Sequence, residues 1–422
     1  MKIVLMCLMS EKFGAFTINN FRFLFSMICV VMIGGGIMVK EIIINEINRI
    51  SDELIKINDF MYDYPELGNE EFKSSQLLKD ILKKHGFSVE RNIANQKTSF
   101  KATYDSKKDG PTVGFLCEYD ALPDIGHGCG HNMIGTMGLG AGIGLSKVID
   151  QIGGKIVVLG TPAEETDGGK VHMVNGGVFE NIDVAMIVHP AAKSFNSGTS
   201  LAMDAIEFEF IGKPSHAAAE PEAGINALDG VIMTFNGINA LREHLKSDVR
   251  IHGIIKEGGV AANIVPERAV AQFYVRAKKR KYLNEVVEKV KNIAKGASLM
   301  TGAKLNVRNY EISYDDMVTN KVLSKVFQDN MKYMKVDDLE ENKSGLGSID
   351  MGNVSYVVPS IHPYIGIKEG VVAHTKEFAD NTITPKAHER IIQGAAAMAL
   401  SGYDVIVDKE LLKLIKEEFE NK

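Results

Sequence analysis

The sequence predicts an α/β fold in which a doubly wound, mostly parallel sheet is interrupted by a smaller α+β domain. Up to about residue 200, short apolar runs alternate with helical stretches rich in small residues, which is typical of βαβ units. The pattern then changes to strands of alternating polarity, and helical periodicity returns near residue 314. The length of 422 residues accommodates two or three domains. We therefore expect an N-terminal extension (1–37), a larger domain in two parts (38–200 and 314–422) and an inserted domain (201–313).

The first part of the larger domain begins with helices. Between Val39 and His85 the apolar residues recur at three- and four-residue steps, which predicts two amphipathic helices, and Gly86 marks the end of the second. Further along the chain, strands are expected at Val113–Leu116, Ile156–Leu159 and Val184–Val188, and helices at Met133–Val148 and Lys170–Gly177. Because helices separate these strands, we expect parallel pairing with both faces of the sheet covered.

The inserted domain has a different pattern. Ala205–Phe210 and Ala269–Ala277 alternate between apolar and polar residues, as half-exposed antiparallel strands do, and a helix is expected between them at Asn226–Leu245. In the second part of the larger domain, the expected elements are a helix at Val322–Met334, a strand at Ser355–Val358 and a helix at Lys386–Leu400.

Composition narrows the classes of partner. Lys and Arg total 48 and Asp and Glu total 54, a net charge of −6, and there is no long basic run, so nucleic acid is not expected as a partner. Four cysteines are too few for a disulfide framework in a chain of this length, which favours a reducing, cytoplasmic location.

The N-terminal extension allows two interpretations. The stretch from Phe23 to Val39 carries no charge, so it could be an anchor or signal that associates the chain with a membrane, although it is shorter than the roughly 20 residues that span a bilayer. Alternatively, three glycines (34–36) shortly before Met38 are what a ribosome-binding site and a start codon look like when translated in frame. The helical pattern begins directly afterwards, which favours a start at Met38 and no membrane partner.

Side chains of the types that ligate metal ions follow three of the predicted strands, near the points where the strands end. Cys129 and His131 follow the first strand, Glu164 and Glu165 the second, and His189 the third. Because the carboxyl ends of parallel strands meet at one edge of a sheet, we expect these side chains to lie close together. Thiolate, imidazole and carboxylate are the ligands of zinc and related divalent ions. The sequence therefore predicts a metal site at this edge.

The two adjacent glutamates suit two different tasks. In an extended segment neighbouring side chains point apart, so one carboxylate can ligate a metal ion while the other faces the attacking water. Metal-assisted hydrolysis needs such a carboxylate, because a base must take a proton from water and return it to the leaving amine.

The motifs around these residues resemble those of a known family. The segments Asp120-Ala121-Leu122-Pro123, Cys129-Gly130-His131, Pro162-Ala163-Glu164-Glu165 and Val188-His189 look like, and follow the order of, those in the cocatalytic metallopeptidases. This is the family of carboxypeptidase G, aminoacylase and p-aminobenzoyl-glutamate hydrolase, and the resemblance extends from Met38 to the C-terminus. The cysteine form of the Cys129-Gly130-His131 motif resembles that of the amidohydrolase and dipeptidase branch of the family. Glu118 stands where the other branch carries a histidine ligand.

The resemblance implies a site with two divalent metal ions, zinc or manganese. Its implied ligands are Cys129 as the bridge, His131 and His189 on one ion, and Glu165 and His374 on the other.

The resemblance also implies roles for four further residues. Glu164 would be the general base, and Asp120 would orient a ligand. His362 is the second candidate for the last histidine ligand, and otherwise a group on the substrate side. Asp350 is expected near the site, either on the substrate side or as a turn former.

For the inserted domain, the resemblance implies a ferredoxin-like lid that also forms a homodimer. The equivalent of His216 would reach the scissile carbonyl from a neighbouring subunit, and Asn263 and Arg276 would hold the carboxylate of the substrate. Arginine suits that task because its planar fork binds a carboxylate through two hydrogen bonds. The basic cluster 278–281 is expected to be a solvated turn.

We therefore expect a metal-dependent hydrolase that cleaves an amide bond to an amino acid, in an N-acyl amino acid or in p-aminobenzoyl-glutamate. A dipeptidase for dipeptides with a basic C-terminal residue is the alternative among hydrolases. A metal-binding protein without catalysis is the alternative from another class, and the presence of Glu164 argues against it.

Overall fold

The computed structural model describes residues 36, 38–336, 338–341 and 347–422. The two interpretations of the N-terminal extension therefore concern residues that lie almost entirely outside the described part. Within that part, no helix combines the length and the apolar character needed to cross a membrane.

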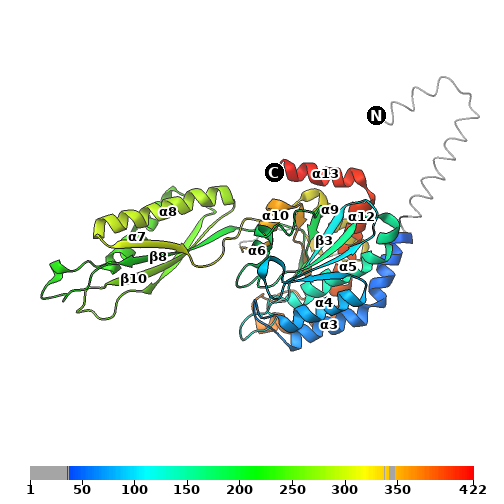
Figure 1. Cartoon of the computed structure of the whole chain (residues 1–422), viewed down its shortest axis with the longest axis horizontal. Helices are drawn as coiled ribbons and strands as arrows, with labels where there is room; N and C mark the ends of the chain where they lie inside the picture. The colour runs from blue at the N-terminus through cyan, green and yellow to red at the C-terminus, as the bar shows by residue number, and fades with distance from the viewer. Residues whose placement is uncertain (1–35, 37, 337, 342–346) are drawn as a thin grey trace, which may run out of the picture.

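A six-stranded sheet forms the centre of the larger domain (Figure 1), in the order β1-β2-β4-β3-β5-β13. Four neighbouring strands pair in parallel: β4 (Lys155–Gly160), β3 (Thr112–Cys117), β5 (Val184–Met186) and β13 (Ser360–Ile361). Two antiparallel strands, β1 (Ser88–Arg91) and β2 (Phe100–Asp105), complete one edge. The predicted parallel sheet is confirmed.

Helices cover both faces of this sheet because alternate side chains of each strand are buried on opposite sides. Val113 and Phe115 of β3 join one core, whereas Leu116 joins another. Helices of the first core include residues 38–49, α3 (Ser51–Asp63), α4 (Phe72–Lys84), α5 (His131–Ile152) and α12 (Pro385–Val407). Those of the second include α6 (Gly169–Asn175) and α10 (Met351–Val357).

A separate four-stranded antiparallel sheet lies beside the larger domain (Figure 1), in the order β11-β8-β10-β9. Its strands are β11 (Lys304–Asn309), β8 (Ala202–Ile211), β10 (Arg268–Ala277) and β9 (Arg250–Glu257). The helices α7 (Ala227–Leu241) and α8 (Arg280–Thr301) bury its apolar side chains in a core of their own. On β10, Ala271, Phe273 and Val275 are buried while Gln272, Tyr274 and Arg276 are partly exposed, as the alternation predicts.

The remaining elements lie near the C-terminal half of the larger domain. A small sheet joins β12 (Leu339–Glu340), β7 (Ser194–Phe195), β14 (Tyr364–Gly366) and β6 (His189–Ala191). The further helices are α9 (Lys321–Tyr333), α11 (Lys376–Asn381) and α13 (Lys409–Glu420).

Three local predictions are wrong. The strand expected at Ser355–Val358 is the end of α10 and the residue after it, because Met351 and Val354 pack as one helix face into the core. The basic cluster is not a solvated turn throughout: Arg280 begins α8, and its side chain is only 16% exposed between Asp204 and Asp315. The strand β8 is also more buried than a half-exposed strand, because β10 and β11 flank it on both sides.

Candidate active site

The candidate active site lies where the parallel strands end. Glu118 and Asp120 follow β3, Glu164 and Glu165 follow β4, and His189 follows β5 by three residues. Since β4, β3 and β5 are neighbours in the sheet, the chain brings these five side chains to one edge.

Cys129 and His131 reach the same edge through a tight turn at the start of α5. Gly130 between them has a φ of 80°, and a Cβ atom there would lie 2.4 Å from Cγ of Pro190. Only glycine fits both the left-handed backbone and the close approach. Because Pro190 follows His189, this contact packs the segment that carries Cys129 and His131 against the segment that carries His189.

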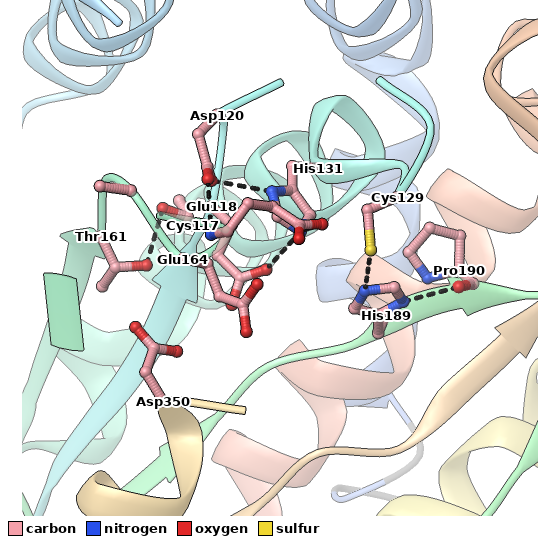
Figure 2. Close-up of polar contacts among 12 residues, drawn as sticks. Cys117, Glu118, Asp120, Cys129, His131, Thr161, Glu164, His189, Pro190 and Asp350 are labelled. Carbon is pink, nitrogen blue, oxygen red and sulfur yellow. Dashed lines mark hydrogen bonds and ion pairs between the residues drawn. The ribbon is translucent and has the colours of Figure 1, made fainter. Parts of the chain in front are cut away.

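The predicted ligands form two groups that share Cys129. The ligand atoms of Cys129, His131 and His189 lie within 4.8 Å of one another, and so do those of Cys129, Glu165 and His374. Figure 2 shows Sγ of Cys129 directed at Nε2 of His189, 3.4 Å away. Nε2 of His374 lies 3.3 Å from Oε1 of Glu165.

Two of the histidines have their Nδ1 atoms occupied by the protein. Nδ1 of His131 lies 2.8 Å from Oδ1 of Asp120, and Nδ1 of His189 lies 2.6 Å from the carbonyl oxygen of Pro190 (Figure 2). Both acceptors favour a proton on Nδ1 and leave Nε2 free as a ligand atom. Oδ2 of Asp120 also accepts the backbone N–H of Glu165 at 3.0 Å. Asp120 thus links two candidate ligands.

The unpartnered atoms at this edge fit a divalent cation. Within the part of the chain that the structure describes, Nε2 of His131, Oε1 of Glu165 and Oε2 of Glu118 are buried and make no hydrogen bond, and their nearest charged neighbours are other candidate site groups at 3.3 Å. Buried polar atoms without a partner are costly, and imidazole, carboxylate and thiolate together are a donor set for zinc and related ions.

The electrostatics of the protein groups point the same way. Burial, joined by repulsion from Asp350 and Glu118, raises the pKa of Glu164 well above its ordinary value. Burial also raises the pKa of the Cys129 thiol, so a cation is needed to favour the thiolate. Burial lowers the pKa of His189 to about 4, which keeps this ring neutral and able to ligate at neutral pH.

The structure places His374, and not His362, beside Glu165. His374 has a φ of 64°, which is unusual for a residue with a side chain, and its backbone N–H donates to the carbonyl oxygen of Gly128 at 2.8 Å. His362 is buried on the other side of the site, with its ring 5.5 Å from that of His189.

Asp350 lies in a turn that precedes α10, as its interpretation as a turn former predicts, and its side chain is paired inside the protein. Its side chain has no exposed surface; Oδ1 contacts the ammonium of Lys170 at 2.7 Å, and Oδ2 accepts the backbone N–H of Lys170 at 3.0 Å. It precedes α10 without capping that helix through its side chain. The ammonium of Lys170 thus pairs with this carboxylate, and a role of Asp350 on the substrate side stays a prediction.

The three predicted residues of the inserted domain lie at two ends of its sheet. The backbone N–H of Ala217, next to His216, donates to the carbonyl oxygen of Asn263 at 3.1 Å, beyond the end of β8 that is remote from the larger domain. Arg276 lies near the other end, where β10 pairs with Met203 at the start of β8. The rise of a strand separates Arg276 from Arg268, at the start of β10, by about 26 Å.

Two buried residues near the site were missed in the sequence. The side chain of Lys170 contacts Glu118 as well as Asp350, and the carboxylate of Glu71 accepts the backbone N–H of Ala163, just before Glu164. Neither residue has a signal in the sequence, because their partners lie far along the chain and are brought close only by folding.

Residues 203–299 match the peptidase dimerisation domain of the M20 family. A Xaa-Arg dipeptidase from Mus musculus is 33% identical over 401 residues, which cover 91% of this chain and 93% of that protein. The chain belongs to the M20 family. Another M20 relative, a p-aminobenzoyl-glutamate hydrolase chain from Escherichia coli, is 35% identical over 293 residues, 62% of this chain and 60% of that protein.

Solved structures share the fold of this M20 chain. An aminobenzoyl-glutamate utilization protein from Klebsiella pneumoniae has a TM-score of 0.66 at 19% identity and covers 84% of this chain and 96% of its own. A Bacillus subtilis protein described as a dinuclear metal-binding peptidase of the M20 family has a TM-score of 0.61 at 15% identity, with coverage of 84% and 99%. The expected fold and family are confirmed, and this M20 protein is a metal-dependent hydrolase of amide bonds.

Proposed function

We propose that this M20 protein is a homodimeric dipeptidase that releases a basic C-terminal residue, and that it uses two divalent metal ions. The observation that carries the substrate class is the similarity to the Xaa-Arg dipeptidase, which extends over 91% of the chain and so includes both the candidate site and the inserted domain. In this proposal residues 201–313 form the lid and the dimer contact, in agreement with the match to a dimerisation domain.

The two ligand groups that share Cys129 support the two-ion proposal. Cys129 would bridge, His131 and His189 would hold one ion, and Glu165 and His374 would hold the other. Zinc suits the cysteine and histidine ligands, whereas the carboxylate also tolerates manganese. When bound, such cations polarise the scissile carbonyl and lower the pKa of the attacking water.

Glu164 is the proposed general base. Its neighbour Glu165 lies beside His374, whereas Glu164 shares a third possible ligand group with His131 and Glu165. In this proposal Glu165 is the ligand and Glu164 the base. Glu164 takes a proton from the attacking water and returns it to the nitrogen of the leaving amino acid. The same carboxyl group carries the proton from the water to the leaving nitrogen.

His216 is proposed to act on the site of the partner subunit. Its Nδ1 accepts the backbone N–H groups of Ala218 and Ala219 at 3.3 and 3.1 Å, so the neutral ring carries its proton on Nε2. Nε2 can then donate a hydrogen bond to the carbonyl oxygen of the scissile bond. Asn263 lies beside His216 and would enter the same site.

Arg276 is proposed to bind the C-terminal carboxylate of the substrate from the end of the sheet next to the larger domain. Its Nε atom is buried and makes no hydrogen bond among the described residues, so one side of the guanidinium is available to a ligand. The ring of Tyr274 lies 5.6 Å from the guanidinium carbon and steadies it.

Hydrolysis of p-aminobenzoyl-glutamate is a second candidate function, because a relative of that name is 35% identical over 62% of the chain. A panel of dipeptides ending in Lys, Arg or Glu, together with p-aminobenzoyl-glutamate and N-acetyl amino acids, separates the two. We expect the highest kcat/KM for dipeptides ending in Lys or Arg, and loss of all activity after chelation. A preference for p-aminobenzoyl-glutamate would contradict the dipeptidase proposal.

A further inference from the structure

Lys170 is a fully buried cation behind the candidate active site. Its ammonium has no exposed surface and lies 2.6 Å from Oε1 of Glu118 and 2.7 Å from Oδ1 of Asp350. Both carboxylates are themselves almost wholly buried. The three side chains therefore form one charged cluster inside the domain.

Such a cluster is a poor way to stabilise a core. Removing three charges from water is costly, and apolar residues of similar volume often stabilise a core equally well. A chain that keeps these charges in its interior therefore uses them for something other than packing. The position of the cluster indicates its function, because the two carboxylate oxygens of Glu118 point to different groups.

One oxygen of Glu118 faces Lys170, and the other faces the candidate metal site. Oε2 lies 3.3 Å from Nε2 of His131, the ring nitrogen that Asp120 leaves free (Figure 2). Within the described residues Oε2 makes no hydrogen bond, although it is buried. The ion pair between Lys170 and Oε1 thus fixes the direction of the Glu118 carboxylate, and with it the position of Oε2 beside the ring of His131.

We infer that Lys170 is a positioning residue for the metal site: it fixes Glu118, which adds a directed negative charge beside the coordinating nitrogen of His131. Asp350 holds Lys170 from the other side through both its ammonium and its backbone N–H. This inference rests on the proposed metal site and adds to it a supporting layer of three residues. Partners in such a layer typically change metal affinity by about 10- to 100-fold.

The test compares cation affinity in Glu118→Gln, Lys170→Met and the double variant, measured by competition of zinc with a chromophoric chelator. Each single variant should weaken the binding of at least one zinc ion about tenfold or more. If Lys170 acts through Glu118, the double variant should bind zinc within about threefold of Glu118→Gln, because the two effects are not additive for coupled residues.

Glu207→Gln is the matched control. Glu207 is also a buried carboxylate in an ion pair, but its partners are Arg308 and Gln272 in the antiparallel sheet. The Glu207→Gln variant should bind zinc with the affinity of the wild type. Lys170→Arg keeps the charge, and it should bind zinc more tightly than Lys170→Met. It also provides a second variant if Lys170→Met does not fold.

The outcomes separate this inference from the proposed function. Zinc affinity equal to that of the wild type in folded Glu118→Gln and Lys170→Met would overturn the inference, while the two-ion site would stand. Additive losses in the double variant would also overturn it, because Lys170 would then act independently of Glu118. A wild-type chain that binds no divalent cation would instead remove the proposed metal site itself.

Discussion

Glu71 illustrates how a single side chain outside the ligand groups shapes the site. Its carboxylate accepts the backbone N–H of Ala163 at 2.8 Å and the hydroxyl of Thr98 at 2.7 Å. Ala163 has a φ of 58°, a left-handed conformation that costs a residue with a Cβ atom about 1–2 kcal/mol. Because Ala163 directly precedes Glu164, Glu71 stabilises the strained turn that presents the base.

Glu71→Gln should change how stability depends on pH. Burial raises the pKa of Glu71 from 4.5 to about 7, so the folded chain binds its proton more tightly than the unfolded chain. In the wild type, the contribution of Glu71 to the free energy of unfolding is fully present below pH 4.5 and is lost as the pH rises through about 7. Glutamine does not titrate; its amide oxygen can accept the backbone N–H of Ala163, and its amide N–H can donate to the hydroxyl oxygen of Thr98. The variant should therefore gain stability relative to the wild type between pH 5 and 8, by about 3 kcal/mol at most.

Calorimetric unfolding of both proteins at pH 5 and pH 8, in the presence of a chelator, measures this difference. A stability difference that is the same at both pH values would show that Glu71 is not protonated in the folded protein near neutral pH.

At the residue scale, the sequence predicted the side chains that gather at the site but not those that support them. Cys129, His131 and Glu165 were predictable because ligand-type side chains that follow neighbouring parallel strands together indicate a metal site. Lys170 and Glu71 act through partners far along the chain, and such pairing depends on tertiary packing that a single sequence does not display.

Among the elements, α5 contributes to the site directly, because its first residue is the candidate ligand His131. The turn before it depends on Gly130, as its φ of 80° and the position of Pro190 show. Strands and helices with clear periodicity, such as β3, β10 and α5, were predictable within a few residues. The end of α10 was mistaken for a strand because a short run rich in Val does not reveal its period.

Gly130→Ala should destabilise the protein by about 2–4 kcal/mol, since the added methyl group meets both backbone strain and the ring of Pro190. It should also weaken metal binding, because Pro190 follows His189. Gly296→Ala is the matched control: Gly296 lies in α8 with no atom within 4 Å of the added Cβ. Thermal unfolding should show a gain for Gly296→Ala of up to about 1 kcal/mol. Equal stability and metal affinity of Gly130→Ala and the wild type would contradict the proposed role of this turn.

At the scale of the whole molecule, the position of the inserted domain decides which of its residues could reach an active site of the same chain. His216 follows β8, at the end of the sheet that is remote from the larger domain (Figure 1), so its proposed catalytic role calls for a second subunit. The sequence predicted the inserted domain from its change of pattern. Which end of its sheet lies beside the larger domain depends on the linkers, and the sequence of the linkers has no periodicity from which their conformation could be predicted.

Complementation tests this arrangement. His216→Ala and Glu164→Gln chains should each be nearly inactive, because one lacks the hydrogen-bond donor and the other lacks the base. After subunit exchange, about half of the dimers should be mixed, and each should contain one intact site, which restores about a quarter of the wild-type rate. Demonstrated exchange without recovery would show that His216 does not act across the dimer.

The most direct test of the central claim compares Glu164→Gln with Glu165→Gln in one experiment that measures both metal content and turnover. We expect Glu164→Gln to keep two metal ions per chain and to lose about 100- to 10,000-fold in kcat, since it lacks only the base. The neighbouring Glu165→Gln should lose metal as well as activity, because Glu165 lies with His374 and Cys129 in one ligand group. Near-normal turnover in metal-replete Glu164→Gln, or full metal content in Glu165→Gln, would contradict the division of roles between these two glutamates.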